Sequence, residues 1–367
     1  MSVAIGAPSS RASASAAGCV YPQPADQRPY GYTPCAPFIK GHAHVLSTFA
    51  AQKFGRGATA IVARGHRAIV AGDGLYLVDS PSRVDILWPP RDQDFWYALS
   101  PMHEGAMALY RNEQVVGVRE DGSLAFHFSI PGTDRGQFDN LTVLEDRRGA
   151  IWALASVNYA GALYLANKSA ARAEVVNVGG DISKVFLDPN DDAYATLANG
   201  TVLRLSASPD ARTRIFHKPI ALENGLPGQF GADGTWRVQG VGLRGSIWLS
   251  NMTTVAHVGS DGRITYLRLA APYTQMLMLI GSISLRIAPD GSAWAYAHQG
   301  FVRITDADVI QTVTVPGLPP QGPTGAFPYA FAPDGSVWYV PNDWGVVHVC
   351  IEGHVGCAES STSAVGR

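Results

Sequence analysis

Short apolar stretches alternate with polar turns through most of the chain, and within many stretches every second residue is apolar, as in a β-strand. Residues 283–288 form one such stretch. Asp290-Gly291 follows as a turn in which glycine supplies a positive φ, and Trp294 begins the next stretch. This order is typical of a β-hairpin. Glycine or proline interrupts nearly every longer window, so the pattern predicts an all-β protein almost without helix.

The hairpin recurs at a period of about 44 residues, the usual length of one blade of a β-propeller. A second hairpin follows in most copies, as in residues 255–267, so each repeat is predicted to be a four-stranded antiparallel sheet. Clear copies join a polar turn and a glycine to a tryptophan. They end at Trp152, Trp248, Trp294 and Trp338, and weaker copies end at Tyr76, Met107 and Tyr194.

Stacking such sheets around an axis covers the faces that a single sheet leaves exposed. The repeats therefore predict a propeller of about seven blades, in which the four tryptophans are structural anchors between neighbouring blades. Tyr76 and Met107 lie closer together than the other anchors, so the first blade is expected to be short, and a six-bladed ring stays an alternative. A strand-like stretch near residues 44–49 has no local partner. We expect this N-terminal strand to complete the last blade and close the ring.

Composition divides the chain into three parts. Residues 1–36 are rich in alanine, serine and proline and are predicted to be flexible, residues 37–359 form the propeller, and residues 360–367 are a flexible tail. The net charge is −2, which leaves no excess of cations for a phosphate backbone, so nucleic acid is not an expected partner. No apolar run reaches the roughly 20 residues of a membrane span. We expect a monomer.

The chain has four cysteines, which fall in two close pairs. Cys350 and Cys357 would lie opposite each other if Gly353-His354 formed a hairpin turn, and this geometry predicts a disulfide. Disulfides persist in oxidising compartments, which favours an extracytoplasmic protein, periplasmic or secreted. The pairing of Cys19 with Cys35 stays open, as does the question whether the N-terminus is the remnant of a signal.

The Pro-Asp-Gly-Ser-x-Trp turns at 289–294 and 333–338 resemble the repeats of the streptogramin (virginiamycin B) lyase family, and residues 144–152 resemble the propeller repeats of two-component sensor ectodomains. The resemblance covers residues 38–359. It implies a seven-bladed propeller. For the lyase family it also implies axial histidine and glutamate side chains with Mg²⁺, which open a lactone by elimination.

The positions that would carry this chemistry are occupied by other residues. The positions equivalent to the family's histidines hold Ile283, Phe327, Arg237 and Leu141. Those equivalent to its glutamates hold Ala297, Pro341, Asn251 and Ala155. A general base must be a titratable group within reach of the proton that it removes. The catalytic residues of the family therefore cannot be transferred to this chain, and whether it is an enzyme stays open.

Polar and aromatic residues near the ends of the predicted strands are candidates for a binding site at the rim of the ring. They are Arg237, Asn251, His298, Asn342, Asp343 and Trp344. Such a mixture suits a small ligand, a glycan or a protein. We therefore expect a binding module without a cofactor or a metal. The alternative is a divergent metal-dependent lyase or hydrolase that uses Mg²⁺ with His298, Arg237 and Asp343. The sequence does not specify the ligand.

Overall fold

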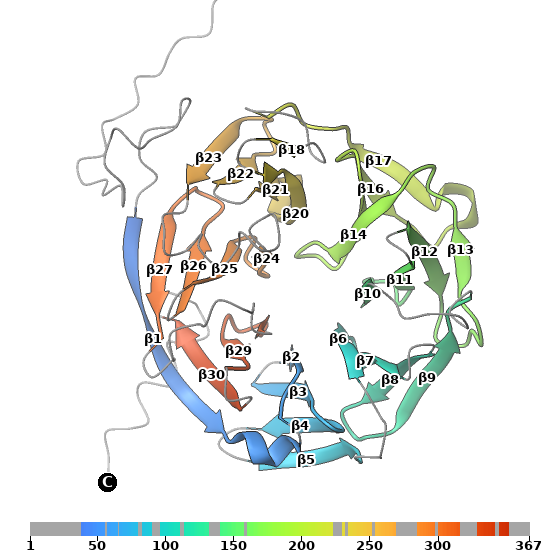
Figure 1. Cartoon of the computed structure of the whole chain (residues 1–367), viewed down its shortest axis with the longest axis vertical. Helices are drawn as coiled ribbons and strands as arrows, with labels where there is room; N and C mark the ends of the chain where they lie inside the picture. The colour runs from blue at the N-terminus through green and yellow to red at the C-terminus, as the bar shows by residue number, and fades with distance from the viewer. Residues whose placement is uncertain are drawn as a thin grey trace, which may run out of the picture.

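The structure is a computed structural model. It describes residues 38–55, 57–64, 66–79, 83–89, 96–110, 114–131, 140–157, 160–222, 230–231, 234–251, 254–268, 285–297, 300–315, 329–341 and 345–351. In this part of the chain, small antiparallel sheets stand side by side in a closed ring around a central axis (Figure 1). The predicted tails, the cysteines other than Cys350, and four of the six rim candidates lie outside the described residues.

The described residues form seven blades, and the first strand of each lies nearest the axis (Figure 1). Blade 1 comprises β2 (Ala60–Arg64), β3 (Arg67–Ala71), β4 (Leu75–Asp79) and β5 (Arg83–Trp88); blade 2 comprises β6 (Trp96–Met102), β7 (Gly105–Tyr110), β8 (Gln114–Arg119) and β9 (Leu124–Ser129). Blade 3 comprises β10 (Asn140–Glu145), β11 (Ile151–Val157), β12 (Ala160–Ala166) and β13 (Glu174–Val176); blade 4 comprises β14 (Ile182–Leu187), β15 (Ala193–Leu197), β16 (Val202–Leu205) and β17 (Thr213–His217).

Blades 5 to 7 continue the same order. Blade 5 comprises β20 (Arg237–Val241), β21 (Ile247–Ser250), β22 (Thr254–Val258) and β23 (Ile264–Arg268); blade 6 comprises β24 (Arg286–Ile287), β25 (Ala293–Ala297), β26 (Gly300–Ile304) and β27 (Ile310–Thr314); blade 7 comprises β28 (Tyr329–Phe331), β29 (Val337–Tyr339), β30 (Val346–Ile351) and β1 (Phe38–Phe49). A two-stranded hairpin, β18 (Phe230–Gly231) and β19 (Gly234–Thr235), precedes blade 5. The helices of the described residues are single 3₁₀ turns, Ala51–Phe54, Pro209–Ala211 and Leu243–Gly245. No helix in this part of the chain is long and apolar enough to cross a membrane.

The N-terminal strand closes the ring, as the sequence predicted. Residues 43–49 of β1 pair antiparallel with β30, and residues 38–42 pair parallel with β27 of blade 6. Because β1 supplies the fourth strand of blade 7 and leads directly into blade 1, it joins the last blade to the first, and its N-terminal half also covers the outer edge of β27.

The prediction of a short first blade was wrong. Blade 1 has four strands, and Asp73-Gly74 lies in the turn between its second and third strands, β3 and β4. Tyr76 is therefore on a third strand, whereas Trp152 and its equivalents are on second strands. The short spacing arose because this turn has the same residue types as the repeat turn but a different place in the blade.

The four repeat tryptophans lie fully buried between blades. Trp248 of blade 5 packs with Leu285 and Ala293 of blade 6, and Trp338 of blade 7 packs with Phe49 and Ile61. The preceding turns explain the repeated sequence. Asp146 accepts hydrogen bonds from two backbone N–H groups of its own turn and from Trp152 Nε1 at 3.0 Å, while Gly149 takes a φ of 78°.

Candidate functional site

The antiparallel topology gives the ring two different faces. On one, which we call the turn face, short turns such as 288–292 and 259–263 join the first strand to the second and the third to the fourth. On the other, the connection face, the chain crosses from blade to blade. Connections on a rigid scaffold are frequent sites of binding.

Two of the six predicted rim residues are described, and both lie at the connection face. Arg237 begins β20 and pairs in register with Ser250, the residue before Asn251. Arg237 is exposed. Asn251 is buried, and its Oδ1 accepts the N–H of Thr254 at 2.8 Å, so this side chain also holds its own turn. His298, Asn342, Asp343 and Trp344 lie outside the described residues.

A group of polar side chains that the sequence did not suggest links three first strands beside the axis. Lys184 on β14 donates a hydrogen bond from Nζ to the backbone oxygen of Gln239 on β20, at 2.7 Å, and lies 3.4 Å from Oε1 of the same residue. That Oε1 also accepts the N–H of Leu285, which precedes β24, at 3.3 Å. The side chain of Gln239 therefore connects Lys184 to the start of β24.

Arg286, the first residue of β24, extends this group to blade 7. Its Nη1 donates to the backbone oxygen of Tyr329, and its guanidinium lies 4.8 Å from the centre of the Tyr329 ring. The hydroxyl of Tyr329 in turn donates to the backbone oxygen of Trp294 at 3.0 Å. We call Lys184 and Arg286 the axial cation pair. Their positive charges are held by carbonyl oxygens and a ring face, with no carboxylate contact among the described residues.

Charge and burial make this pair unusual. Burial, together with the nearby positive charge of Arg286, lowers the pKa of Lys184 to about 8. Burial raises the pKa of the Tyr329 hydroxyl to about 12, an effect that Arg286 opposes. A lysine that loses affinity for its proton in this way is a group that a bound anion would stabilise. Arg286 itself is exposed and Lys184 is half-buried, so solvent reaches both.

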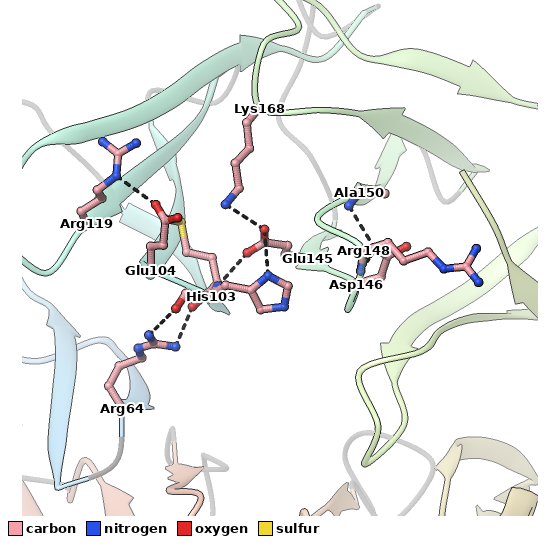
Figure 2. Close-up of polar contacts among 10 residues, drawn as sticks. Arg64, His103, Glu104, Arg119, Glu145, Asp146, Arg148, Ala150 and Lys168 are labelled. Carbon is pink, nitrogen blue, oxygen red and sulfur yellow. Dashed lines mark hydrogen bonds and ion pairs between the residues drawn. The ribbon is translucent and has the colours of Figure 1, made fainter. Parts of the chain in front are cut away.

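On the turn face, by contrast, several cations are paired with carboxylates. At the centre of Figure 2, Glu145 is 1% exposed; its Oε2 accepts the backbone N–H of His103 at 2.7 Å, and its Oε1 lies 3.0 Å from Lys168 Nζ and 3.3 Å from His103 Nδ1. Glu145 and Lys168 belong to blade 3, and His103 belongs to the turn of blade 2. This cluster therefore fastens one blade to the next.

Similar contacts fasten blade 1 to blade 2 and blade 3 to blade 4. Arg64 of blade 1 donates to the backbone oxygens of Met102 and His103, at 2.7 and 2.6 Å (Figure 2). Arg147 of blade 3 lies 2.8 Å from Asp192 of blade 4. The same face holds further pairs: Arg64 with Glu120, Arg119 with Glu104, Arg204 with Asp192 and Arg303 with Asp290. We interpret the turn face as a structural surface.

The remaining candidates are a metal site and a disulfide. Among the residues that the structure describes, no group of three or more histidine, cysteine, aspartate or glutamate side chains is placed to hold a metal ion. Cys350 is buried in β30, opposite His44 of β1. Cys357 lies outside the described residues, so the bridge between the two stays a prediction.

No protein-family model and no curated protein matches the sequence, but solved structures match the fold. A catalytically inactive virginiamycin B lyase from Staphylococcus aureus, with quinupristin, has a TM-score of 0.56 and 12% identity, covering 84% of this chain and 99% of its own. YCF48 bound to D1 peptide has a TM-score of 0.50 and 13% identity, covering 86% and 99%.

The extracellular domain of a hybrid two-component system from B. thetaiotaomicron has a TM-score of 0.52 and 12% identity, covering 83% of this chain and 42% of that one. Both kinds of protein that the repeats resemble are thus among the structural neighbours. The chain is a β-propeller. At these identities the likeness concerns the fold alone.

Proposed function

We propose that this β-propeller is a binding module that takes a small ligand, a glycan or a protein segment at the axial rim of its connection face. The observation that carries the proposal is the difference between the two faces. The turn face is occupied by ion pairs and hydrogen-bonded turns that join the blades. The connection face carries the exposed Arg237.

Two structural neighbours support a binding role. Virginiamycin B lyase was solved with quinupristin, and YCF48 was solved bound to a peptide. A propeller ring is therefore able to present a site to a small molecule or to a peptide. A lyase function is less favoured for this chain. In blade 5, Arg237 and Asn251 occupy the positions equivalent to the family's histidine and glutamate, and Asn251 Oδ1 accepts a hydrogen bond from Thr254 N–H. An extracytoplasmic location, stabilised by a disulfide at Cys350, is part of the proposal.

The test begins with a screen of the purified full chain against quinupristin, a glycan array and a peptide array. The face that binds a hit is then mapped by hydrogen exchange. Binding at the rim predicts slower exchange in residues 237–241 and no change in residues 259–263. Arg237→Ser should weaken binding, whereas Arg263→Ser, which removes an exposed arginine from the turn face of the same blade, should not.

Three results would contradict the proposal. The first is the absence of saturable binding in all three classes of compound. The second is protection of residues 259–263 with sensitivity to Arg263→Ser, because the ligand would then occupy the turn face. The third is conversion of quinupristin to a ring-opened product, which would make the protein a lyase.

A further inference from the structure

At the axial cation pair, positive charge is left without a carboxylate contact among the described residues. The first strands of the seven blades contain Arg64, Lys184, Arg237 and Arg286, and the one acidic residue in these strands as described is Glu145. Glu145 is paired with Lys168 and His103, and Arg64 is paired with Glu120. Positive charge therefore remains beside the axis, although the whole chain has a net charge of −2.

We infer that Lys184 and Arg286 together bind one oxyanion group of a ligand, a carboxylate or a phosphate, beside the axis of the ring. This inference rests on the proposed function and names the chemical class of its ligand. Guanidinium and ammonium groups are the usual partners of such groups in proteins, the first through a planar fork of donors and the second as a compact charge.

Unused hydrogen-bond donors support this role. Arg286 has five N–H groups, and the described structure engages one of them, with the oxygen of Tyr329. Lys184 has three, of which the 2.7 Å bond to the backbone oxygen of Gln239 and the long contact to its Oε1 use at most two. An incoming oxyanion would accept the remaining donors without breaking any of these contacts.

The pair is also held in place before a ligand arrives. Gln239 positions the ammonium through its backbone oxygen, and its Oε1 is in turn fixed by Leu285 N–H. Tyr329 supports the guanidinium through its ring. Two like charges near each other weaken the folded state, and a bound anion removes this cost. Burial and Arg286 already lower the pKa of Lys184, and an anion would raise it again.

The first experiment titrates the full chain with succinate and, separately, with inorganic phosphate by isothermal calorimetry at pH 7 and constant ionic strength. We expect saturable binding of one of them at one site per chain, and the preferred probe distinguishes a carboxylate ligand from a phosphate ligand. Lys184→Met and Arg286→Gln should each weaken binding about tenfold or more. Arg214→Gln removes an exposed arginine from outer strand β17 and should leave affinity unchanged.

A second experiment does not depend on removing either charge. Succinate keeps its charge above pH 7, so its affinity should fall as Lys184 loses its proton in alkaline solution. Lys184→Arg keeps a positive charge in that range and should retain affinity at pH 9.5. Equal loss of affinity in the wild type and in Lys184→Arg would overturn the assignment of Lys184.

The outcomes separate this inference from the proposed function. Absence of saturable binding of both oxyanions, or binding unchanged by Lys184→Met and Arg286→Gln, overturns the inference. If one of these results is obtained but a compound from the wider screen still slows exchange in residues 237–241, the proposed binding function is retained. The ligand is then not held through an oxyanion. If no compound protects the connection face, the proposed function fails as well.

Discussion

The buried imidazole of His348 makes a quantitative prediction about acid stability. His348 lies on β30, is 3% exposed, and stacks on Trp338 with ring centres 3.9 Å apart. Its Nε2 is 2.8 Å from Ser336 Oγ. Because that hydroxyl donates to Asp334, its oxygen is left to accept an N–H from His348 Nε2. Nδ1 is buried, with no hydrogen-bond partner among the described residues. The arrangement fits the neutral imidazole.

Protonation would place a charge and an unmatched N–H in this interior. Burial lowers the pKa of His348 to about 4 from 6.5, and Asp334 opposes the shift. In the unfolded chain the imidazole takes up a proton near pH 6.5, whereas the folded chain resists protonation until about pH 4. Stability is therefore fully present above pH 6.5 and is lost as the pH falls below it. Between pH 8 and pH 5 the linkage relation gives a loss of about 2 kcal/mol, and the full shift corresponds to about 3 kcal/mol.

The assay compares wild type with His348→Gln, which keeps an N–H donor but does not titrate. Urea unfolding followed by circular dichroism at pH 8, 7, 6 and 5 gives the free energy of unfolding of each protein. Other titrating groups contribute equally to both, so the wild type should lose about 2 kcal/mol more than the variant between pH 8 and pH 5. His127→Gln, which replaces an exposed imidazole on β9, is the control and should follow the wild type. Equal pH dependence of wild type and His348→Gln would refute the reasoning.

Three further predictions concern the anchors, the cysteines and catalysis. Trp294→Ala empties a fully buried site between blades and should lower the free energy of unfolding by about 3 to 5 kcal/mol; an unchanged urea midpoint would show that this indole is not an anchor. Cys350 and Cys357 should resist alkylation without reductant in native protein, as read by intact mass, and labelling of both would remove the argument for an oxidising compartment. Incubation with quinupristin and Mg²⁺ should give no linear product by mass spectrometry, because Ile283, Phe327, Ala297 and Pro341 offer no general base.

The repeat could be predicted because its physics is local. A turn carboxylate that accepts bonds from its own backbone, a glycine with positive φ and a buried indole all lie within seven residues of one another, as Asp146, Gly149 and Trp152 show. The strand order of the first blade could not be predicted, because the link between its first and second strands has neither the carboxylate nor a following tryptophan. The residue types of a turn do not show which two strands of a blade the turn joins. The pairing of the strands shows this.

The partners of the repeat tryptophans depend on register, which the residue pattern did not reveal. Trp248 stacks on His257 and Trp338 stacks on His348, each pair lying opposite across the second and third strands of its blade. In blade 6 the same position holds Arg303. An alignment of the third strands of all copies would have brought these residues into one column.

The axial cation pair illustrates what ring closure adds to the repeat. Lys184 and Arg286 belong to different blades, each is a single charge in an apolar strand, and neither has a neighbour in sequence that suggests a site. The first strands of blades 4 and 6 both lie beside the axis, and Gln239 on the first strand between them links Lys184 to the start of β24. Elsewhere the fold matches such charges: Arg303 has Asp290 and Arg147 has Asp192. The same protein pairs several cations with carboxylates at its turn face. Two cations beside the axis that contact no carboxylate among the described residues are therefore a local cost that packing does not require. Such conflicts between local stability and the fold are expected where a protein binds its ligand.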